Sequence, residues 1–517
     1  MYRFIPSWYS SVFKWHASET PGRAKRDGYE FDDTVNQVRM FLSAGEDVEI
    51  MVLAYMPRMR NFLHRQGLSS VRVFSVFDKV QGIEESRCGL LSYQDLEWPE
   101  DVEFVFTPFV ISAFSQNRYF ARIDLSQEGA LLWIDYLGED GKTERRNLFD
   151  DRGFLSSTLF FEEDEVVRQD FFDMSGRLVL RHQILEGKLE QFANGTVKRT
   201  YASEEEMIAK VLGKHLASSA QEDTIIIASK EQHNAIAIQS AKGRSVVLSY
   251  FEDRFDLKKE EALQRDTSYA KLIVTDTEHT AKQIREVVGG KTPIYDISPF
   301  DTRLSLGKSQ RIRELKVFMP IDFLEEPFRG YALAQIFAFM QKNPDVSLLV
   351  GTTNPTKRNI HGLIDGLREA LEKNQVEGIL VEDEDEEKEP GENELEEEEV
   401  KPRIFIKTYL SETDLIRILY DTRLILDVSD QPDLYLQIAG ISAGIPQINY
   451  RFTRYVEHLK DGFIIQNIHH VTDGLEYYLT GLANWNEALV YCIQEIIKYT
   501  GGNLVAKWKE LVAGNEI

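Results

Sequence analysis

The sequence contains two cysteines, Cys88 and Cys492, among 517 residues. Two thiols are too few for a disulfide framework or for a structural zinc site with several cysteine ligands. We therefore expect both thiols to be buried or half-buried in a reducing compartment. No metal site is expected, and no motif in the sequence indicates a cofactor.

The sequence also lacks a long hydrophobic run. None of its apolar stretches approaches the roughly 18 residues that a membrane-spanning helix needs. The first residues, Met1 to Trp8, show no charged segment followed by an apolar one, so no signal peptide is expected. These absences predict a cytoplasmic protein, and any contact with the inner face of the cell membrane would be peripheral.

Basic residues are in deficit: 60 Lys and Arg stand against 85 Asp and Glu, a net charge of −25. Such a balance cannot neutralise phosphates, so no nucleic-acid partner is expected. Part of the acidity is local, because thirteen of the eighteen residues in 382–399 are Asp or Glu. Their mutual repulsion and the Pro390-Gly391 pair predict a solvated loop.

The first hundred residues have an α/β pattern. Phe4-Ile5-Pro6 is a candidate strand, the spacing from Phe31 to Leu42 predicts a helix, and Val48–Leu53 is typical of a buried strand. Strand, helix and strand in this order need a parallel sheet. A further strand is expected at Val71–Phe77.

From Val102 to about Phe192 apolar and polar residues alternate. Turn sequences such as Glu139-Asp140-Gly141-Lys142 and Asn194-Gly195 punctuate this stretch at hairpin spacing. The pattern predicts an antiparallel β insertion, whose exposed face is either a docking surface or the solvated side of a meander. The α/β pattern resumes at Glu204, so the first sheet is completed after the insertion.

A second α/β set begins near Lys316, and its expected strands include Gly378–Val381, next to the acidic run. The last helix opens at Asn484, with Glu487 at capping-box spacing, and Leu489, Ile493, Ile496 and Ile497 as its apolar stripe. We expect this closing segment to cross back to the first domain. The predicted division is 1–101 with 193–310, 102–192, 311–483 with the acidic loop 382–399, and 484–517.

The most informative stretch runs from Asp427 to Ile465. It contains the turn Gly444-Ile445-Pro446 and the tail Val456–Ile465. These resemble the nucleotide-sugar half of retaining glycosyltransferases with two facing Rossmann-like domains, the GT-B architecture. That resemblance implies an α/β, GT-B-like fold with the antiparallel β-sheet insertion in its first domain.

The family's two carboxylates are missing. The Glu-x7-Glu pair that holds the donor's ribose and supports the leaving sugar would fall at Gln431 and Ala439. Neither side chain carries a charge, and losing two charge-assisted bonds removes several kcal/mol by order of magnitude. Gly444 would then be a vestige of the donor site, and no catalytic residue is expected.

The clamp for the donor's diphosphate is also incomplete. Arg329-Gly330 stands where a Lys-Gly is expected, but Asp322 lies upstream and would repel phosphate. In the first domain the loop Pro6-Ser7-Trp8-Tyr9 replaces a Gly-rich turn, and its aromatic side chains obstruct close approach to an anion. Four candidate bases stand alone, without a partnered Ser or Cys motif: His16, His233, His361 and His458.

Together with the opening Tyr2–Tyr9 and the β insertion, these departures resemble the first of the three accessory Sec system proteins of Gram-positive cocci. The resemblance spans essentially the whole chain. It implies a non-catalytic protein that assembles with two sibling proteins. It also implies that this complex serves the accessory Sec ATPase and channel in the export of serine-rich repeat glycoprotein adhesins. The glycosylated adhesin precursor would then be a further partner.

Two alternatives remain open from the sequence. One is an active nucleotide-sugar glycosyltransferase that modifies a protein or a surface glycan, against which Gln431 and Ala439 argue. The other is a module that keeps glycan binding in the cleft between the domains. Fold by itself does not establish activity.

Overall fold

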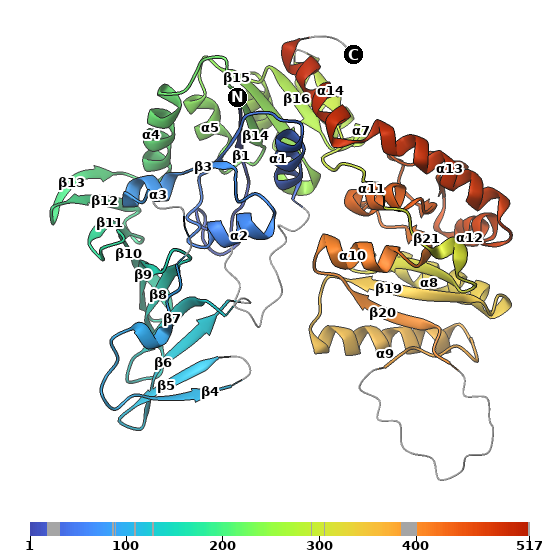
Figure 1. Cartoon of the computed structure of the whole chain (residues 1–517), viewed down its shortest axis with the longest axis horizontal. Coiled ribbons are helices and arrows are strands. Elements are labelled where there is room, and N and C mark those ends of the chain that lie inside the picture. The colour runs from blue at the N-terminus through green and yellow to red at the C-terminus, as the bar shows by residue number, and fades with distance from the viewer. Residues whose placement is uncertain are drawn as a thin grey trace.

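The computed structural model describes residues 1–17, 32–84, 87, 89–107, 110–126, 129–290, 292–303, 305–383 and 401–514. It contains a seven-stranded parallel sheet, a ten-stranded antiparallel sheet and a six-stranded parallel sheet. The two parallel sheets lie in separate halves of the molecule, and the antiparallel sheet extends from the first half (Figure 1). The expected α/β class with an antiparallel insertion is confirmed.

The first parallel sheet has the order β17-β16-β15-β14-β1-β2-β3. Its strands are β1 (Tyr2–Ile5), β2 (Val48–Val52), β3 (Arg72–Ser75), β14 (Thr224–Ala228), β15 (Ser245–Tyr250), β16 (Leu272–Thr275) and β17 (Ile294–Asp296). β1 pairs with β2 on one side and with β14 on the other. The sheet is therefore begun before the insertion and completed after it, as the sequence predicts.

Helices cover this sheet: α1 (Asp33–Ser43), α2 (Met59–Arg65), α3 (Val76–Gln81), α4 (Glu204–Ala217), α5 (Asn234–Ser240), α6 (Glu260–Thr267) and α7 (Glu278–Val288). α1 begins where the Asp32 side chain accepts the Val35 amide at 3.0 Å. The expected strand at Val71–Phe77 is too long, because the Ser75 side chain accepts the Asp78 amide and starts α3.

The antiparallel sheet comprises β4 (Glu103–Phe106), β5 (Ile111–Ser115), β6 (Arg118–Leu125), β7 (Leu131–Leu137), β8 (Thr143–Asp150), β9 (Phe154–Glu162), β10 (Glu165–Phe172), β11 (Leu178–Gln183), β12 (Lys188–Ala193) and β13 (Thr196–Tyr201). The expected end at residue 192 is one strand short, because Asn194-Gly195 is a hairpin turn within the sheet. The sheet is anchored to the first domain: the Tyr55 hydroxyl donates to Ser157 at 2.9 Å, and Gln81 donates to the Phe172 carbonyl at 2.7 Å.

The third sheet has the order β20-β19-β18-β21-β22-β23. Its strands are β18 (Leu315–Pro320), β19 (Val346–Thr352), β20 (Ile404–Thr408), β21 (Thr422–Asp427), β22 (Gln447–Asn449) and β23 (Gly462–Ile464), and its helices are α8 (Phe328–Lys342), α9 (Lys357–Lys373), α10 (Glu412–Leu419), α11 (Leu434–Ala443) and α12 (Val471–Leu479). The expected strand Gly378–Val381 is wrong. Gly378 has φ of +75°, which turns the backbone, and Val381 alone forms a bridge, to Ile404.

The chain ends in α13 (Ala483–Lys498) and α14 (Gly501–Ala513). The capping box expected at Asn484 does not form: α13 has no side-chain cap, and Asn484 instead donates to the Tyr477 carbonyl at 3.0 Å. The buried residues of α13 are Trp485, Ala488, Cys492 and Ile496. Of the expected apolar stripe, Ile493 and Ile497 are exposed.

α14 lies against α1 at the first domain (Figure 1). Phe41 of α1 meets Trp508 of α14 edge to face, and Lys509 pairs with Glu46 at 2.6 Å. A further contact between the halves is the ion pair of Arg39 with Glu412 at 2.8 Å. The two α/β halves are thus held together by packing and by ion pairs.

The acidic residues 384–399 and Cys88 lie outside the described residues. Cys492 is buried, as expected. Within the described part of the chain, none of the helices combines the length and the apolar character needed to cross a membrane.

Candidate functional site

The N-terminus of α11 lies between Gln431 and Ala439, the positions of the expected glutamate pair, and a helix N-terminus attracts anions such as phosphate. Here two carboxylates of the chain itself accept backbone amides at this end of the helix. The Asp433 side chain accepts the Leu436 amide at 2.9 Å, and Asp427 accepts the Asp433 amide at 2.9 Å. A diphosphate at this helix would meet two acidic side chains.

Burial raises the pKa of both carboxyl groups. Burial, reinforced by the charge of Asp427, raises the pKa of Asp433 to about 6. Burial likewise raises the pKa of Asp427, although the Ser429 hydroxyl donates to it. At neutral pH Asp433 is mostly ionised, so the α11 N-terminus repels a phosphate group.

Gln431 links the two halves of the molecule. Its side-chain amide donates to the Asp253 carboxylate of the first domain. The side chain at the position of the family's first glutamate is therefore engaged in a contact between domains. The sequence indicates the loss of charge at Gln431 but gives no sign of this partner.

Ala439 lies on α11, where it is half-buried. It packs against an apolar cluster that includes Phe318, Leu349 and Leu415. A methyl group fits this environment, whereas a carboxylate would be costly without a partner. Gln431 and Ala439 thus both contribute to structure at the positions of the expected glutamate pair.

Arg329, the expected member of a phosphate clamp, is held locally. Its guanidinium donates to Glu326 at 3.0 Å, at the start of α8. Asp322 is also engaged, because it accepts the Thr353 amide and the Thr352 hydroxyl at 2.6 Å each. An arginine paired with a carboxylate offers a phosphate little net charge.

Gly444 has a clear packing role at the C-terminus of α11. It is left-handed, with φ of +71°, and a Cβ there would lie 2.4 Å from Leu489 Cδ1 and 3.0 Å from Leu306 Cδ2. Glycine satisfies both the conformation and the close approach of α13 and the linker between the domains. This accounts for Gly444 without a donor.

The first-domain loop is filled with aromatic rings. Trp8 is 1% exposed and packs edge to face on Phe62, and the Tyr9 hydroxyl lies 2.9 Å from His233 Nδ1. Burial lowers the pKa of His233 to about 3 and that of His16 to about 4, so both rings are neutral. A ring with so low a pKa binds a proton too weakly to serve as a general base at neutral pH, so neither histidine fits that role.

Glu252 of the first domain lies near Asp433, the residue that caps α11, and near two other acidic residues. Partial loss of water, followed by the charges of Asp433, Asp276 and Asp33, raises the pKa of Glu252 to about 8. Glu252 also has φ of +47°, an uncommon conformation for a residue with a side chain. No sequence motif marks Glu252, whereas the N-cap position of Asp433 could have been predicted from the sequence.

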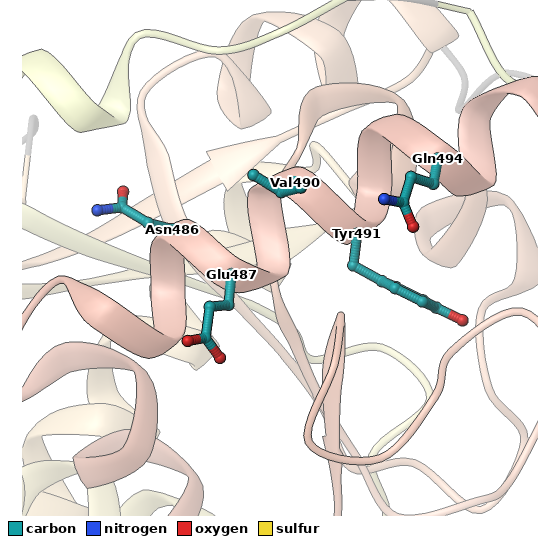
Figure 2. Close-up of a pocket in the computed structure, with 5 residues that line it drawn as sticks. All are labelled: Asn486, Glu487, Val490, Tyr491 and Gln494. Carbon is teal, nitrogen blue, oxygen red and sulfur yellow. The ribbon is translucent and has the colours of Figure 1, made fainter.

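A shallow hollow of about 350 Å³ lies along α13 (Figure 2). The hollow is lined by Asn486, Glu487, Val490, Tyr491 and Gln494. None of these five side chains is positively charged, so none of them would hold a diphosphate. Among the residues that the structure describes, no group of three or more His, Cys, Asp and Glu side chains is placed to hold a metal ion.

Comparisons with known proteins agree with this geometry. A curated relative from Streptococcus gordonii, the accessory Sec system protein 1, is 34% identical over 99% of this chain and 98% of its own length. Two solved structures match with TM-scores of 0.82. One is the Glycosylation Associate Protein (Gap123) complex from Streptococcus agalactiae, at 34% identity over 98% of this chain and 99% of the other. The second, of accessory secretory proteins 1, 2 and 3 in Streptococcus pneumoniae, matches at 30% identity over 99% and 100%.

A more distant match shows the fold alone. The pneumococcal O-GlcNAc transferase GtfA, solved in complex with UDP and GlcNAc, aligns with a TM-score of 0.71 at 11% identity over 99% of both chains. The fold is therefore that of GT-B glycosyltransferases. The family model for the accessory Sec system protein 1 matches residues 1–514. This chain belongs to the family of the accessory Sec system protein 1, the first of the accessory Sec proteins.

Proposed function

We propose that this protein is a non-catalytic, glycosyltransferase-like subunit of the accessory Sec complex. It assembles with two sibling proteins and supports the export of serine-rich repeat glycoprotein adhesins. Relatives at 34% and 30% identity were solved as complexes of three such proteins, which supports the two siblings as partners. The accessory Sec ATPase, the channel and the glycosylated adhesin precursor are its further partners in this proposal.

The main support for proposing no donor chemistry is the arrangement of side chains at the N-terminus of α11. There Asp433 accepts the Leu436 amide and Asp427 accepts the Asp433 amide, while Gln431 contacts Asp253. Oriented charge at the leaving diphosphate is usually the largest catalytic contribution in such transfers. This site offers acids where cations are required, so we propose that the chain uses neither a nucleotide sugar nor another cofactor.

The β insertion supplies part of the partner interface in this proposal. It projects from the first domain (Figure 1), is anchored there through Tyr55 and Gln81, and ends in two edge strands. The protein works in the cytoplasm, and any contact with the membrane is peripheral.

The test is co-purification from the native host, with mass spectrometry of the proteins that accompany the tagged chain. The expected result is recovery of both siblings, while an unrelated tagged cytoplasmic protein of similar size recovers neither. Recovery of neither sibling at native expression levels would refute the proposed assembly.

A further inference from the structure

The ten-stranded sheet has two edges, β4 at one end and β13 at the other. Each edge strand pairs with one neighbour, β4 with β5 and β13 with β12. Within the described part of the chain, no backbone hydrogen bond other than those to β5 involves residues 103–106. The outer side of β4 is thus open to another strand.

The outward groups of β4 follow from the hairpin that joins it to β5. The Thr107 amide donates to the Val110 carbonyl at 3.1 Å, so these two residues form a hydrogen-bonded pair. Bonded and non-bonded pairs alternate along an antiparallel ladder. Val105 and Glu103 therefore direct their backbone groups toward β5, whereas Phe104 and Phe106 direct theirs outward.

The two edges differ in how they are protected. β13 exposes Val197 by 50%, but it also carries Lys198 and Arg199 in exposed positions, and Lys198 forms a bulge across from the step between Gln191 and Phe192 of β12. Charges and bulges are devices that keep edge strands from pairing. β4 instead exposes Val105 by 49% and Phe106 by 65%.

The side chain of Phe104 turns inward. It contacts the rings of Tyr93 and Trp98 at centroid distances of 5.0 and 5.3 Å. This packing holds β4 in place as a preformed strand, so a partner would not have to order it. The open edge is thus both fixed and apolar.

Acidic side chains gather at the start of β4: Glu97, Glu100, Asp101 and Glu103 are all exposed. Asp101 is partly engaged, since it accepts the Ser115 hydroxyl at 2.9 Å and the Gln116 amide at 2.7 Å. A strand that docks here would therefore meet apolar surface at Val105 and Phe106 and negative charge at Glu103.

From this geometry we infer that β4 accepts an extended, apolar strand of one sibling protein, with a basic residue opposite Glu103. The occupant is identified by chemistry: an extended backbone can pair in register with the outward groups of Phe104 and Phe106, which otherwise face solvent, and a basic side chain complements Glu103. This inference rests on the proposed assembly with two siblings and names the surface that one of them uses.

The test measures the affinity of each purified sibling for the full-length chain by biolayer interferometry. F106P removes the outward amide of β4 while leaving the bonds to β5, and proline is tolerated at such edge positions. F106A removes the ring and keeps the amide. We expect F106P to bind one sibling about fivefold more weakly than F106A does, as the loss of one backbone hydrogen bond implies.

A second variant keeps the test valid if F106P folds poorly by circular dichroism. E103K places a positive charge at an exposed position, and we expect it to weaken the same sibling more at low salt than at high salt. K198E on β13 and F452A, at another 65% exposed phenylalanine, are matched controls and should bind as the wild type does.

The outcomes separate the two proposals. If the wild-type chain binds neither sibling, the proposed assembly fails and this inference falls with it. If the wild-type chain binds a sibling, and both F106P and E103K bind that sibling as tightly as the wild type does, the assembly stands and β4 is not the docking edge. A change of similar size but opposite sign for E103K and K198E would also overturn the inference, since it would show a general effect of net charge.

Discussion

Gly444→Ala should destabilise the protein because Gly444 caps α11 against α13. An alanine at φ of +71° costs about 1–2 kcal/mol through backbone strain alone. Its Cβ would also lie 2.4 Å from Leu489 Cδ1 and 3.0 Å from Leu306 Cδ2, so both leucines must move. Crowding of this kind typically costs about 1–3 kcal/mol more. We expect a total loss of about 2–5 kcal/mol.

Gly289→Ala is the matched control. Gly289 caps α7 with φ of +68°, almost the same conformation, but a Cβ there has no atom within 4 Å. The Gly289→Ala variant should therefore lose stability through backbone strain alone, by about 1–2 kcal/mol in the free energy of unfolding. The difference between the two variants isolates the contact of α11 with α13 and the linker.

The assay is urea denaturation of both variants, followed by tryptophan fluorescence. Gly444→Ala should unfold at a clearly lower urea concentration than Gly289→Ala. Equal midpoints would show that Leu489 and Leu306 yield without cost, and would refute the packing role of Gly444. A stable Gly444→Ala variant with changed affinity for UDP sugars would point instead to a surviving donor contact.

Three further predictions concern charge. The double variant Gln431→Glu with Ala439→Glu should show no transfer in a radiolabelled UDP-sugar assay, because the Asp433 carboxylate still opposes the diphosphate and Arg329 remains paired with Glu326; robust transfer would mean that the site is more intact than its geometry indicates. Glu252→Gln should raise the melting temperature at pH 8.5 and leave it unchanged near pH 4.5. A carboxyl whose pKa rises to about 8 on folding costs stability progressively between those values, so equal shifts at both pH values would contradict the assigned pKa. Deletion of residues 384–399 should leave the melting temperature in differential scanning fluorimetry nearly unchanged, since a self-repelling acidic run contributes few contacts, and a fall of several degrees would show that the run is packed.

Periodicity is enough to predict most strands and the split first sheet. β14 and β16 are continuous apolar runs, and α7 ends where Gly289 takes a left-handed conformation, a common helix stop. Errors arise where a local hydrogen bond overrides the apolar pattern. The Ser75 side chain ends β3 and starts α3, and Asn484 bonds to the Tyr477 carbonyl and leaves α13 uncapped.

The candidate site shows the same division. The absence of the glutamate pair follows directly from Gln431 and Ala439 in the sequence. Their partners do not, because the contact of Gln431 with Asp253 joins residues 178 positions apart. The high pKa of Glu252 likewise depends on loss of water around its carboxyl group and then on the charges of Asp433 and Asp276, which only the folded chain brings near it.

The central claim is that a glycosyltransferase fold serves here as an assembly subunit without donor chemistry. Its most direct test is a calorimetric titration of the purified protein, alone and in complex with its siblings, with UDP-linked sugars, combined with a turnover assay on the same samples. We predict no saturable donor binding and no hydrolysis or transfer in either form. Tight, saturable binding together with measurable turnover would contradict the claim.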